Sequence, residues 1–503
     1  MEWFDDWGVS LATFLPIVGA VVLLFLPAVQ ERLIKLVGLA TTGLALLVGI
    51  VVAARFDYGA AGEIQFEVKR EWIPQITAQY HVGLDGMALP LFVLSLLVSF
   101  LCLIYTWWHL EAPGKPKAFI ALVLLLETGM TGTFVALDLV LFFVFWELVL
   151  VPMYFLIGIW GGPRREYAAV KFFLYTLFGS IFMLLGFIAL WINVGTFDII
   201  ELQNQGVNAS TLYQNLVFLG LFLGFAIKVP MWPFHTWLPD AHTEAPTVGS
   251  VLLAAILLKM GTYGFIRIAF PILPDAAVAY APVIGILAVI AIIYGALCCF
   301  AQSDLKRLIA FSSVGHMGFV MLGLATLTDA GINGAIFGMV AHGLITGMLF
   351  FLAGSVHERY HTRQISELGG MLRQIPRFGS VLTFTAIASL GLPGLAGFWG
   401  EVLALLGSYQ PHGELSPTLF RALMVGGGIG TVLTAGYFLW TLQRVNMGSV
   451  PERFADGRGI FDVVAFEWWA WAPLIALIAV AGVYPKIILA VTDGAVERLL
   501  GVF

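Results

Sequence analysis

The sequence has few charged residues: Asp, Glu, Lys and Arg make up 11% of its 503 residues, whereas ordinary soluble domains contain about 25%. Hydrophobic residues make up 60% of the chain, and no Ser-, Pro- or Gln-rich linker or run of charge interrupts it. These absences exclude a soluble multidomain protein. We predict one integral membrane domain whose main solvent is the lipid bilayer.

Basic stretches and cysteine motifs are also missing. The chain has 25 Lys and Arg against 31 Asp and Glu, and no basic run is long enough to follow a phosphate backbone, so nucleic acid is not a partner. Cys102, Cys298 and Cys299 lie in apolar runs without CxxC or Cys/His spacing. We therefore expect no metal or cofactor site in this chain.

Long apolar runs fill most of the sequence. Because a helix needs about 20 apolar residues to cross the hydrocarbon core, these runs predict an all-α, polytopic membrane protein with about fourteen transmembrane helices. The predicted spans are 8–28, 33–55, 87–108, 118–137, 138–160, 168–194, 213–235, 247–270, 278–301, 307–326, 332–354, 378–408, 419–445 and 464–491.

The basic residues predict the orientation, because Lys and Arg accumulate in cytoplasmic loops. They gather after the odd-numbered spans, with few after the even-numbered ones, apart from Lys69, Arg70 and Arg421. Both termini should therefore lie on the non-cytoplasmic side. The residues in the odd loops are Arg32, Lys35, Lys115, Lys117, Arg164, Arg165, Lys306, Arg307, Arg359, Arg363, Arg373, Arg377, Arg453 and Arg458.

Several ionisable residues lie inside the predicted spans. A charge at mid-bilayer costs at least about 2.5–3.5 kcal/mol, so such a residue usually lines a water path or meets a partner. We take these residues as candidates for moving protons. They are Glu147, Lys171, Lys228, Lys259, His316, His342 and Glu401.

Glu147 and Lys228 suggest a switch. If the carboxylate approaches Lys228, the lysine stays charged; if it turns away, the buried lysine is pushed to release its proton. The alternative is a static ion pair between two helices.

The other candidates also have structural alternatives. His316 and His342 could simply hydrogen-bond neighbouring helices, and Lys171 could extend to the membrane interface. The polar stretch HTWLPDAHTE, residues 235–244, indicates a proton entrance, with a capped hairpin or a metal site as alternatives; it lacks HExxH-type spacing.

The candidate residues recur along the chain. Glu147, Lys171 and Lys228 are followed by His316, His342 and Glu401 at an offset of about 170 residues. This spacing predicts two five-helix repeats, the second inverted because five is odd. The predicted parts are 1–117 with three helices, 118–270 and 278–445 as the repeats, and 446–503 with the last helix.

Both repeats should contain a broken helix. Pro230 and Pro233 follow Lys228, and Gly391, Pro393 and Gly394 precede Glu401. A proline removes a helix hydrogen bond, which would leave the carbonyls of Ala226 and Val229 unpaired. Broken helices at matching positions of two halves point to a transport site, although kinks that only serve packing are the alternative.

Four segments resemble a known family. DLVLFFVFWELVLVPMYFLIG, KVPMWPFHTWLPDAHTEAPTVGS, LLKMGTYG and GLPGLAGFWGE resemble the antiporter-like subunits of complex I, the respiratory NADH:quinone oxidoreductase, and within them the chain M type. The resemblance implies that Glu147 pairs with Lys228, that Lys259 is the central relay and that Glu401 is the terminal site.

The resemblance also implies partners and a location. FMN, iron–sulfur clusters, NADH and quinone are expected in partner subunits, and none in this chain. The partners would be chains L and N, small membrane subunits and a peripheral redox arm, in a prokaryotic plasma membrane or an equivalent energy-converting membrane. The alternative functions are a subunit of a cation/proton antiporter or of a membrane-bound hydrogenase, and a structural spacer without transport. Sodium is the alternative to the proton as the transported ion.

Overall fold

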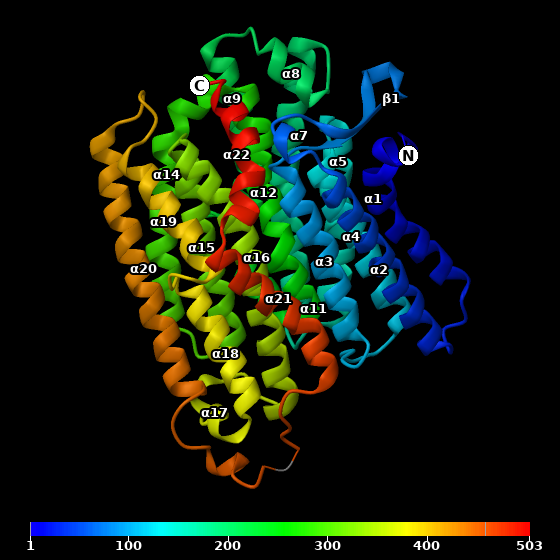
Figure 1. Cartoon of the computed structure of the whole chain (residues 1–503), viewed down its shortest axis with the longest axis vertical. Coiled ribbons are helices and arrows are strands. Elements are labelled where there is room, and N and C mark those ends of the chain that lie inside the picture. The colour runs from blue at the N-terminus through cyan, green and yellow to red at the C-terminus, as the bar shows by residue number, and fades with distance from the viewer. Residues whose placement is uncertain (1, 458) are drawn as a thin grey trace.

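The computed structural model describes residues 2–457 and 459–503. Arg458, one of the basic residues used to predict the orientation, lies outside them. The described chain is a bundle of helices that run roughly along the long axis of the molecule (Figure 1), and its β-structure is one two-stranded hairpin. The predicted all-α, polytopic class is confirmed.

Within residues 2–457 and 459–503, thirteen helices are long and apolar enough to cross a membrane. Two of them are composite, and the chain is an integral membrane protein. The continuous ones are α1 (Glu2–Phe25), α2 (Glu31–Arg55), α3 (Ala88–Thr106), α4 (Pro116–Val135), α7 (Arg165–Val194), α9 (Thr211–Lys228), α14 (Pro274–Phe300), α15 (Leu305–Ala325), α16 (Asp329–Tyr360), α20 (Pro417–Val445) and α21 (Ala465–Val483).

The composite helices join shorter pieces. One consists of α5 (Leu139–Leu148) and α6 (Leu150–Trp160). The other contains two π-helical segments and consists of α11 (Thr247–Leu252), η3 (Leu253–Leu257), α12 (Leu258–Gly264), η4 (Phe265–Ala269) and α13 (Phe270–Ile272).

The remaining expected span, 378–408, is divided into two helices, each too short to be counted among the thirteen. They are α18 (Pro376–Ser389) and α19 (Ala396–Tyr409). The other elements are β1 (Gln65–Ile73), β2 (Ala78–Leu84), α8 (Ile199–Gln205), α10 (Trp237–Glu244), α17 (Met371–Gln374), α22 (Lys486–Leu500), η1 (Tyr58–Ala60), η2 (Pro74–Ile76), η5 (Ile365–Glu367) and η6 (Glu452–Phe454).

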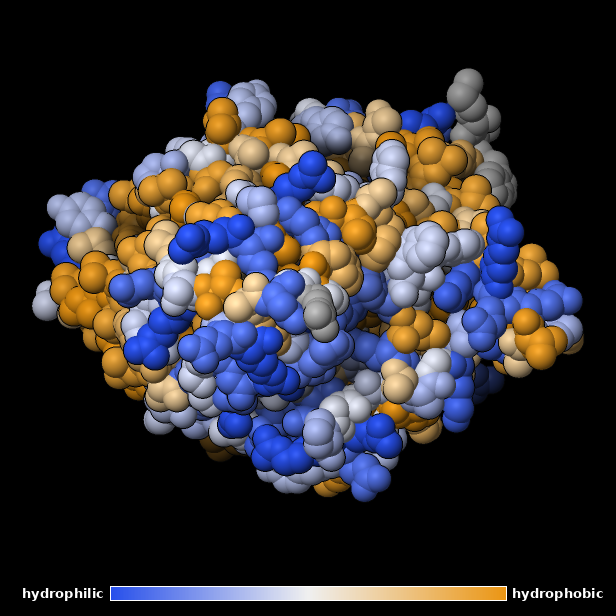
Figure 2. All heavy atoms as spheres, turned by 90° about the horizontal axis from the view of Figure 1, so that it is seen from below, coloured by the Kyte–Doolittle hydropathy of each residue, from blue (hydrophilic) through white to orange (hydrophobic). Residues whose placement is uncertain are grey.

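Both termini lie at the same end of the bundle, together with β1 and α8 (Figure 1). The opposite end carries α17 and the loop that follows α20, and hydrophilic residues gather there while apolar residues surround them (Figure 2). Arg373 and Arg377 in this region are exposed. The basic loops and the termini therefore lie at opposite ends.

The hairpin β1–β2 is fastened to the terminus-bearing end through Asp198, which caps α8. Its Oδ2 atom accepts hydrogen bonds from His81 Nδ1 at 2.7 Å and from Lys69 Nζ at 2.8 Å. Burial raises the pKa of Asp198, but these bonds more than offset it and lower the pKa to about 2. The carboxylate therefore stays charged and holds the hairpin.

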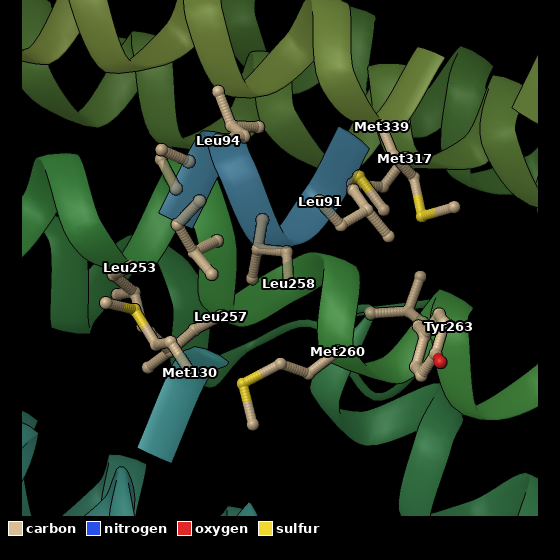
Figure 3. Packing of buried hydrophobic residues seen from close by; sticks show 14 of the residues in the cluster. Leu91, Leu94, Met130, Leu253, Leu257, Leu258, Met260, Tyr263, Met317 and Met339 are labelled. Atoms are coloured by element: carbon tan, nitrogen blue, oxygen red, sulfur yellow. The ribbon is translucent and has the colours of Figure 1, made fainter. Parts of the chain in front are cut away.

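The composite helix from Thr247 to Ile272 forms the centre of the bundle, and all of its residues are buried inside the protein. Apolar side chains such as Leu91, Met130 and Met339 pack around α12 (Figure 3). Gly261 lets α9 approach, because a Cβ atom there would lie 2.7 Å from the Phe225 carbonyl oxygen. The two lysine-bearing helices thus pack against each other.

Candidate functional site

Lys228 is the last residue of α9, at the point where the helix breaks, and it is 2% exposed. After the break the chain continues as α10. The Ala226 carbonyl accepts a hydrogen bond from Met231 N at 2.9 Å, and the Ile227 carbonyl accepts one from Trp237 Nε1 at 2.9 Å. The expectation that the Ala226 carbonyl is unpaired was wrong, because the chain turns back on itself and supplies a donor.

Glu147 lies on α5, beside the lysine. The Lys228 ammonium sits over the Trp146 ring, 5.0 Å from its centroid, and Trp146 Nε1 donates to Ser180 Oγ at 3.0 Å. Glu147 interacts electrostatically with Lys228, yet among the described residues no ion pair within 4.0 Å joins them. The structure therefore holds the two groups as separated neighbours.

Lys171 on α7 has a different partner. Its Nζ atom donates to Asp240 Oδ2 on α10 at 2.7 Å, and the lysine side chain is 22% exposed. Arg307 lies 3.8 Å from the other Asp240 oxygen. Lys171 is thus tied to the polar stretch 235–244 rather than placed between Glu147 and Lys228.

Lys259 is fully buried in the central helix and contacts His342. Its Nζ atom donates to His342 Nδ1 at 2.6 Å and to the Ala254 carbonyl at 2.5 Å. Ala254 lies in the π-helical segment η3, and π turns of this kind are frequent at functional sites. When Lys259 is charged it has only donors, so His342 Nδ1 then accepts and the imidazole proton lies on Nε2.

His316 on α15 links His342 to Glu401. The two imidazole rings lie 5.8 Å apart between centroids, and His316 Nδ1 lies 3.3 Å from Glu401 Oε1. The other nitrogen of His316 contacts Ser389 Oγ at 3.0 Å. Four candidate residues, Lys259, His342, His316 and Glu401, therefore form one row in the protein interior, called the buried row below; the side chain of His316 is 12% exposed.

Glu401 lies just beyond the break between α18 and α19. Gly391, in the break, has φ +81°, and a Cβ atom there would lie 3.0 Å from Glu401 Oε2. Only a glycine permits this conformation and this approach without strain. The break therefore brings backbone directly against the carboxylate.

A small cavity lies among these groups. Its volume of about 30 Å³ is lined by His316, His342, Ser389 and Glu401, and this space is enough for one or two water molecules. His342 Nε2 has no hydrogen-bond partner among the described residues. A water molecule in the cavity could connect this nitrogen to His316.

The stretch 235–244 supplies a further buried histidine. His242 is fully buried, its ring stacks on Phe350 with 4.4 Å between centroids, and neither ring nitrogen has a partner among the described residues. It interacts electrostatically with both Lys306 and Lys259. It therefore lies near both a basic residue close to the loops and the central lysine.

One group of side chains has the donor types of a metal site. Donor atoms of His109, Glu358 and Glu467 lie within 4.8 Å of one another. However, Glu467 already binds Arg359 at 2.6 Å, and His109 lies 2.8 Å from Glu358. The geometry is that of paired charges.

Sequence reasoning missed several residues that shape the row. Ser389 and Trp146 are neutral and carry no signal of their own. Asp240 belongs to the polar stretch that was singled out, but its link to Lys171 spans 69 residues and depends on the fold. Thr431 Oγ1, 3.4 Å from Glu401 Oε2, is one of many threonines in the chain.

Comparisons with known proteins agree with this architecture. The transmembrane family described as NADH:quinone oxidoreductase/Mrp antiporter matches residues 136–425. NADH-quinone oxidoreductase subunit M of Rhodobacter capsulatus is 41% identical over 98% of this chain and 96% of its own. The subunit M of Rickettsia typhi is 37% identical over 98% of both chains.

Solved structures show the same fold. A chain of respiratory complex I from Thermus thermophilus with bound NADH superposes with a TM-score of 0.86 at 30% identity, covering 98% of this chain and 100% of that one. A chain of the Mrp complex from Dietzia sp. gives a TM-score of 0.82 at 20% identity, covering 98% and 97%.

Together, the buried row and the broken helices define a polytopic membrane protein with titratable groups at its centre. The chain belongs to the transmembrane family shared by NADH:quinone oxidoreductase and Mrp antiporters. The expected family is confirmed.

Proposed function

We propose that this chain is a proton-translocating membrane subunit of an NADH:quinone oxidoreductase. The observation that carries the proposal is the buried row Lys259–His342–His316–Glu401, in which consecutive groups are in contact or separated by a cavity that fits water. Such a row lets a proton pass by short transfers, whereas a structural role requires only isolated pairs. The chain carries no redox group of its own in this proposal.

Glu147 and Lys228 act as a switch outside the row, on helices near its Lys259 end. Their separation, with Lys228 over Trp146, supports a contact that forms and breaks rather than a static pair. When Glu147 approaches, Lys228 holds its proton; when it withdraws, the buried ammonium lacks a counter-charge and passes the proton towards Lys259. Gly261, which lets α9 pack against α12, keeps the two lysines on adjoining helices.

Protons enter from the end that carries the basic loops. Lys171 and Asp240 lie there in a partly exposed pair. His242 is buried, neither of its ring nitrogens has a hydrogen-bond partner among the described residues, and it lies near both Lys306 and Lys259. His342 and Lys171 are thus assigned to relaying, and Glu401 is the terminal group of the row.

The surroundings follow from the same proposal. Electrons move in partner subunits that hold FMN, iron–sulfur clusters, NADH and quinone, and the membrane partners are chains L and N and small membrane subunits. The chain lies in a prokaryotic plasma membrane or an equivalent membrane with both termini outside the cytoplasm. The segments 118–270 and 278–445 are inverted repeats, each with one broken helix.

The test is the ratio of protons moved to electrons transferred by the whole complex in vesicles. We expect Lys228→Ala and Glu147→Ala to lower this ratio, because each removes one half of the switch, while the assembled complex still contains its redox groups. Lys486→Ala, which removes an exposed lysine, is the matched control and should leave the ratio unchanged. An unchanged ratio in Lys228→Ala and Glu147→Ala would refute the proposal.

A cation/proton antiporter subunit is the alternative function. The similarity to the Mrp complex, at 20% identity, shows only that the fold is shared, whereas the identity to oxidoreductase subunits reaches 41%. Sodium dependence of transport would favour the antiporter.

A further inference from the structure

A second buried charge lies on the same composite helix as Lys259. Arg267, in η4, donates from Nη2 to Asp85 Oδ1 at 2.5 Å, and both side chains are 4% exposed. Its Nε atom donates to the Tyr263 hydroxyl at 2.9 Å, which in turn donates to the Phe134 carbonyl at 2.8 Å. The guanidinium is therefore held from two sides in one position.

This charge stands between Lys259 and the terminus-bearing end. Asp85 directly follows β2, and the Arg267 carbonyl accepts a hydrogen bond from Gln203 of α8 at 2.8 Å. Both elements lie at that end (Figure 1). Lys259 is eight residues away along the helix, roughly 12 Å deeper.

Water can reach the outer side of the ion pair. A cavity of about 90 Å³ adjoins it, large enough for several water molecules, and two of its lining residues, Asn204 and Arg498, are exposed. Polar residues in its lining are Asp85, Gln203, Asn204, Arg267 and Arg498.

The inner side of the pair is apolar by contrast. Met260 of α12 and Met317 and Met339 of the neighbouring helices α15 and α16 belong to the apolar packing around Tyr263 (Figure 3), and all three are buried. The ion pair therefore lies between a cavity with room for water and the apolar packing around α12.

We propose that Arg267 is an electrostatic barrier that keeps protons at the terminus-bearing end from reaching Lys259. The inference rests on the proposed function, because a pump needs its central lysine insulated from the side to which protons are delivered. Arginine suits the task since it does not lose its proton in proteins, so it repels an incoming proton and cannot relay one. Positively charged groups exclude protons from membrane pores in the same way.

Asp85 is a positioning residue in this arrangement. Its Oδ1 atom also accepts from the backbone N–H groups of Met87 and Ala88 at 3.1 and 3.0 Å, so the carboxylate is anchored at the start of α3. The pair is thus tied to two helices, but the barrier itself is the positive charge of Arg267.

The test is passive proton leak in vesicles that contain the whole complex, measured without NADH as the decay of an imposed pH gradient. We expect Arg267→Gln to speed the decay by about tenfold, the order expected from losing a nearby charge in a partly screened site. Asp85→Asn, which also breaks the ion pair but keeps the positive charge, should leave the decay at the wild-type rate. Equal leak in the two variants would show that the pair is merely structural and would overturn the proposal.

Two further variants keep the test decisive. The double variant Arg267→Gln/Asp85→Asn leaves no unpaired charge and should assemble even if a single variant does not; the barrier requires that it leak. Arg359→Gln breaks another buried pair, with Glu467, and should not leak. The barrier would be refuted by a double variant whose pH gradient decays at the wild-type rate, or by an Arg359→Gln variant whose gradient decays faster than that.

Adding Lys259→Met to Arg267→Gln tests whether the leaking protons pass through Lys259. If they do, the leak should fall to the wild-type rate. A leak that persists would overturn the proposal that Arg267 shields Lys259. The decay is measured without electron transfer, so its result stands apart from the pumping ratio. A normal ratio of protons to electrons in the Lys228 and Glu147 variants would refute the proposed function. A wild-type rate of decay in Arg267→Gln would refute only the barrier.

Discussion

At the scale of single residues, buried cations in this protein have two kinds of environment. Arg267 and Arg359 each face a carboxylate, Asp85 and Glu467, at 2.5 and 2.6 Å. Lys259 instead faces the imidazole of His342 and a carbonyl. Buried ion pairs are compensated and static, whereas a lysine bound only to neutral groups can lose its proton without leaving a partner charge unpaired.

Asp198 gives a prediction for the hairpin. Its carboxylate accepts from His81 and Lys69, so Asp198→Asn should loosen β1–β2 by about 1.5–3 kcal/mol at neutral pH, the range for a hydrogen bond to a charged group. Faster deuterium uptake in residues 65–84 of the assembled complex would measure this loss. Glu201→Gln, which removes a half-exposed partner of Lys69, is the matched control and should change uptake little.

The pH dependence of this contact has a definite sign. Because the pKa of Asp198 is lowered from 3.8 to about 2, its contribution is fully present above pH 3.8 and is lost as the pH falls through 2. The difference between wild type and Asp198→Asn should therefore be undiminished at pH 5. A difference that had already vanished at pH 5 would contradict the assignment.

At the scale of elements, the break between α18 and α19 allows a matched comparison. Gly391 and Gly394 both have positive φ, +81° and +94°, but a Cβ atom meets Glu401 only at Gly391. Either Gly→Ala change should cost about 1–2 kcal/mol through the left-handed backbone. Only Gly391→Ala should also lower the pumping ratio, because its methyl group displaces the carboxylate.

The two variants separate backbone strain from proton transfer. Thermal unfolding of the purified complex reports the strain, and the ratio of protons to electrons in vesicles reports the transfer. If Gly391→Ala and Gly394→Ala lowered the ratio equally, the contact with Glu401 would have no role in transport.

The elements also show what the sequence could and could not predict. The breaks after Lys228 and before Glu401 were predictable, because Pro and Gly act through local backbone geometry. The π-helical segments beside Lys259 were not, since they leave the apolar pattern of the helix unchanged. Contacts such as Lys171 with Asp240 depend on tertiary packing, and the residue that caps a freed carbonyl, Met231 for Ala226, depends on how the loop turns.

At the scale of the whole molecule, hydropathy alone predicted the class and, apart from the divided span 378–408, the positions of the spans, because the bilayer imposes a minimum length on each crossing. It did not predict which spans are central. The helix from Thr247 to Ile272 is entirely buried, whereas a third of α2 is buried, although both are apolar. Ionisable residues do not distinguish the central helix either, because several other spans contain them as well.

The orientation gives a prediction for the whole chain. Asn204 lies at the end that carries the termini, and Arg373 lies in the opposite, basic region; both are exposed. We expect a membrane-impermeant thiol reagent to label Asn204→Cys, and not Arg373→Cys, in right-side-out vesicles, because basic loops stay in the cytoplasm. The reverse labelling pattern would invert the proposed orientation.

The burial of the central helix has a consequence for how the chain is made. Arg267 meets Asp85, which is synthesised 182 residues earlier, whereas Lys259 meets His342, which is synthesised 83 residues later. At a translation rate of about 5–20 residues per second, the lysine waits on the order of ten seconds for its partner. A newly made helix with an unmatched cation is costly in lipid, so we expect its release from the insertion machinery to follow the emergence of α16.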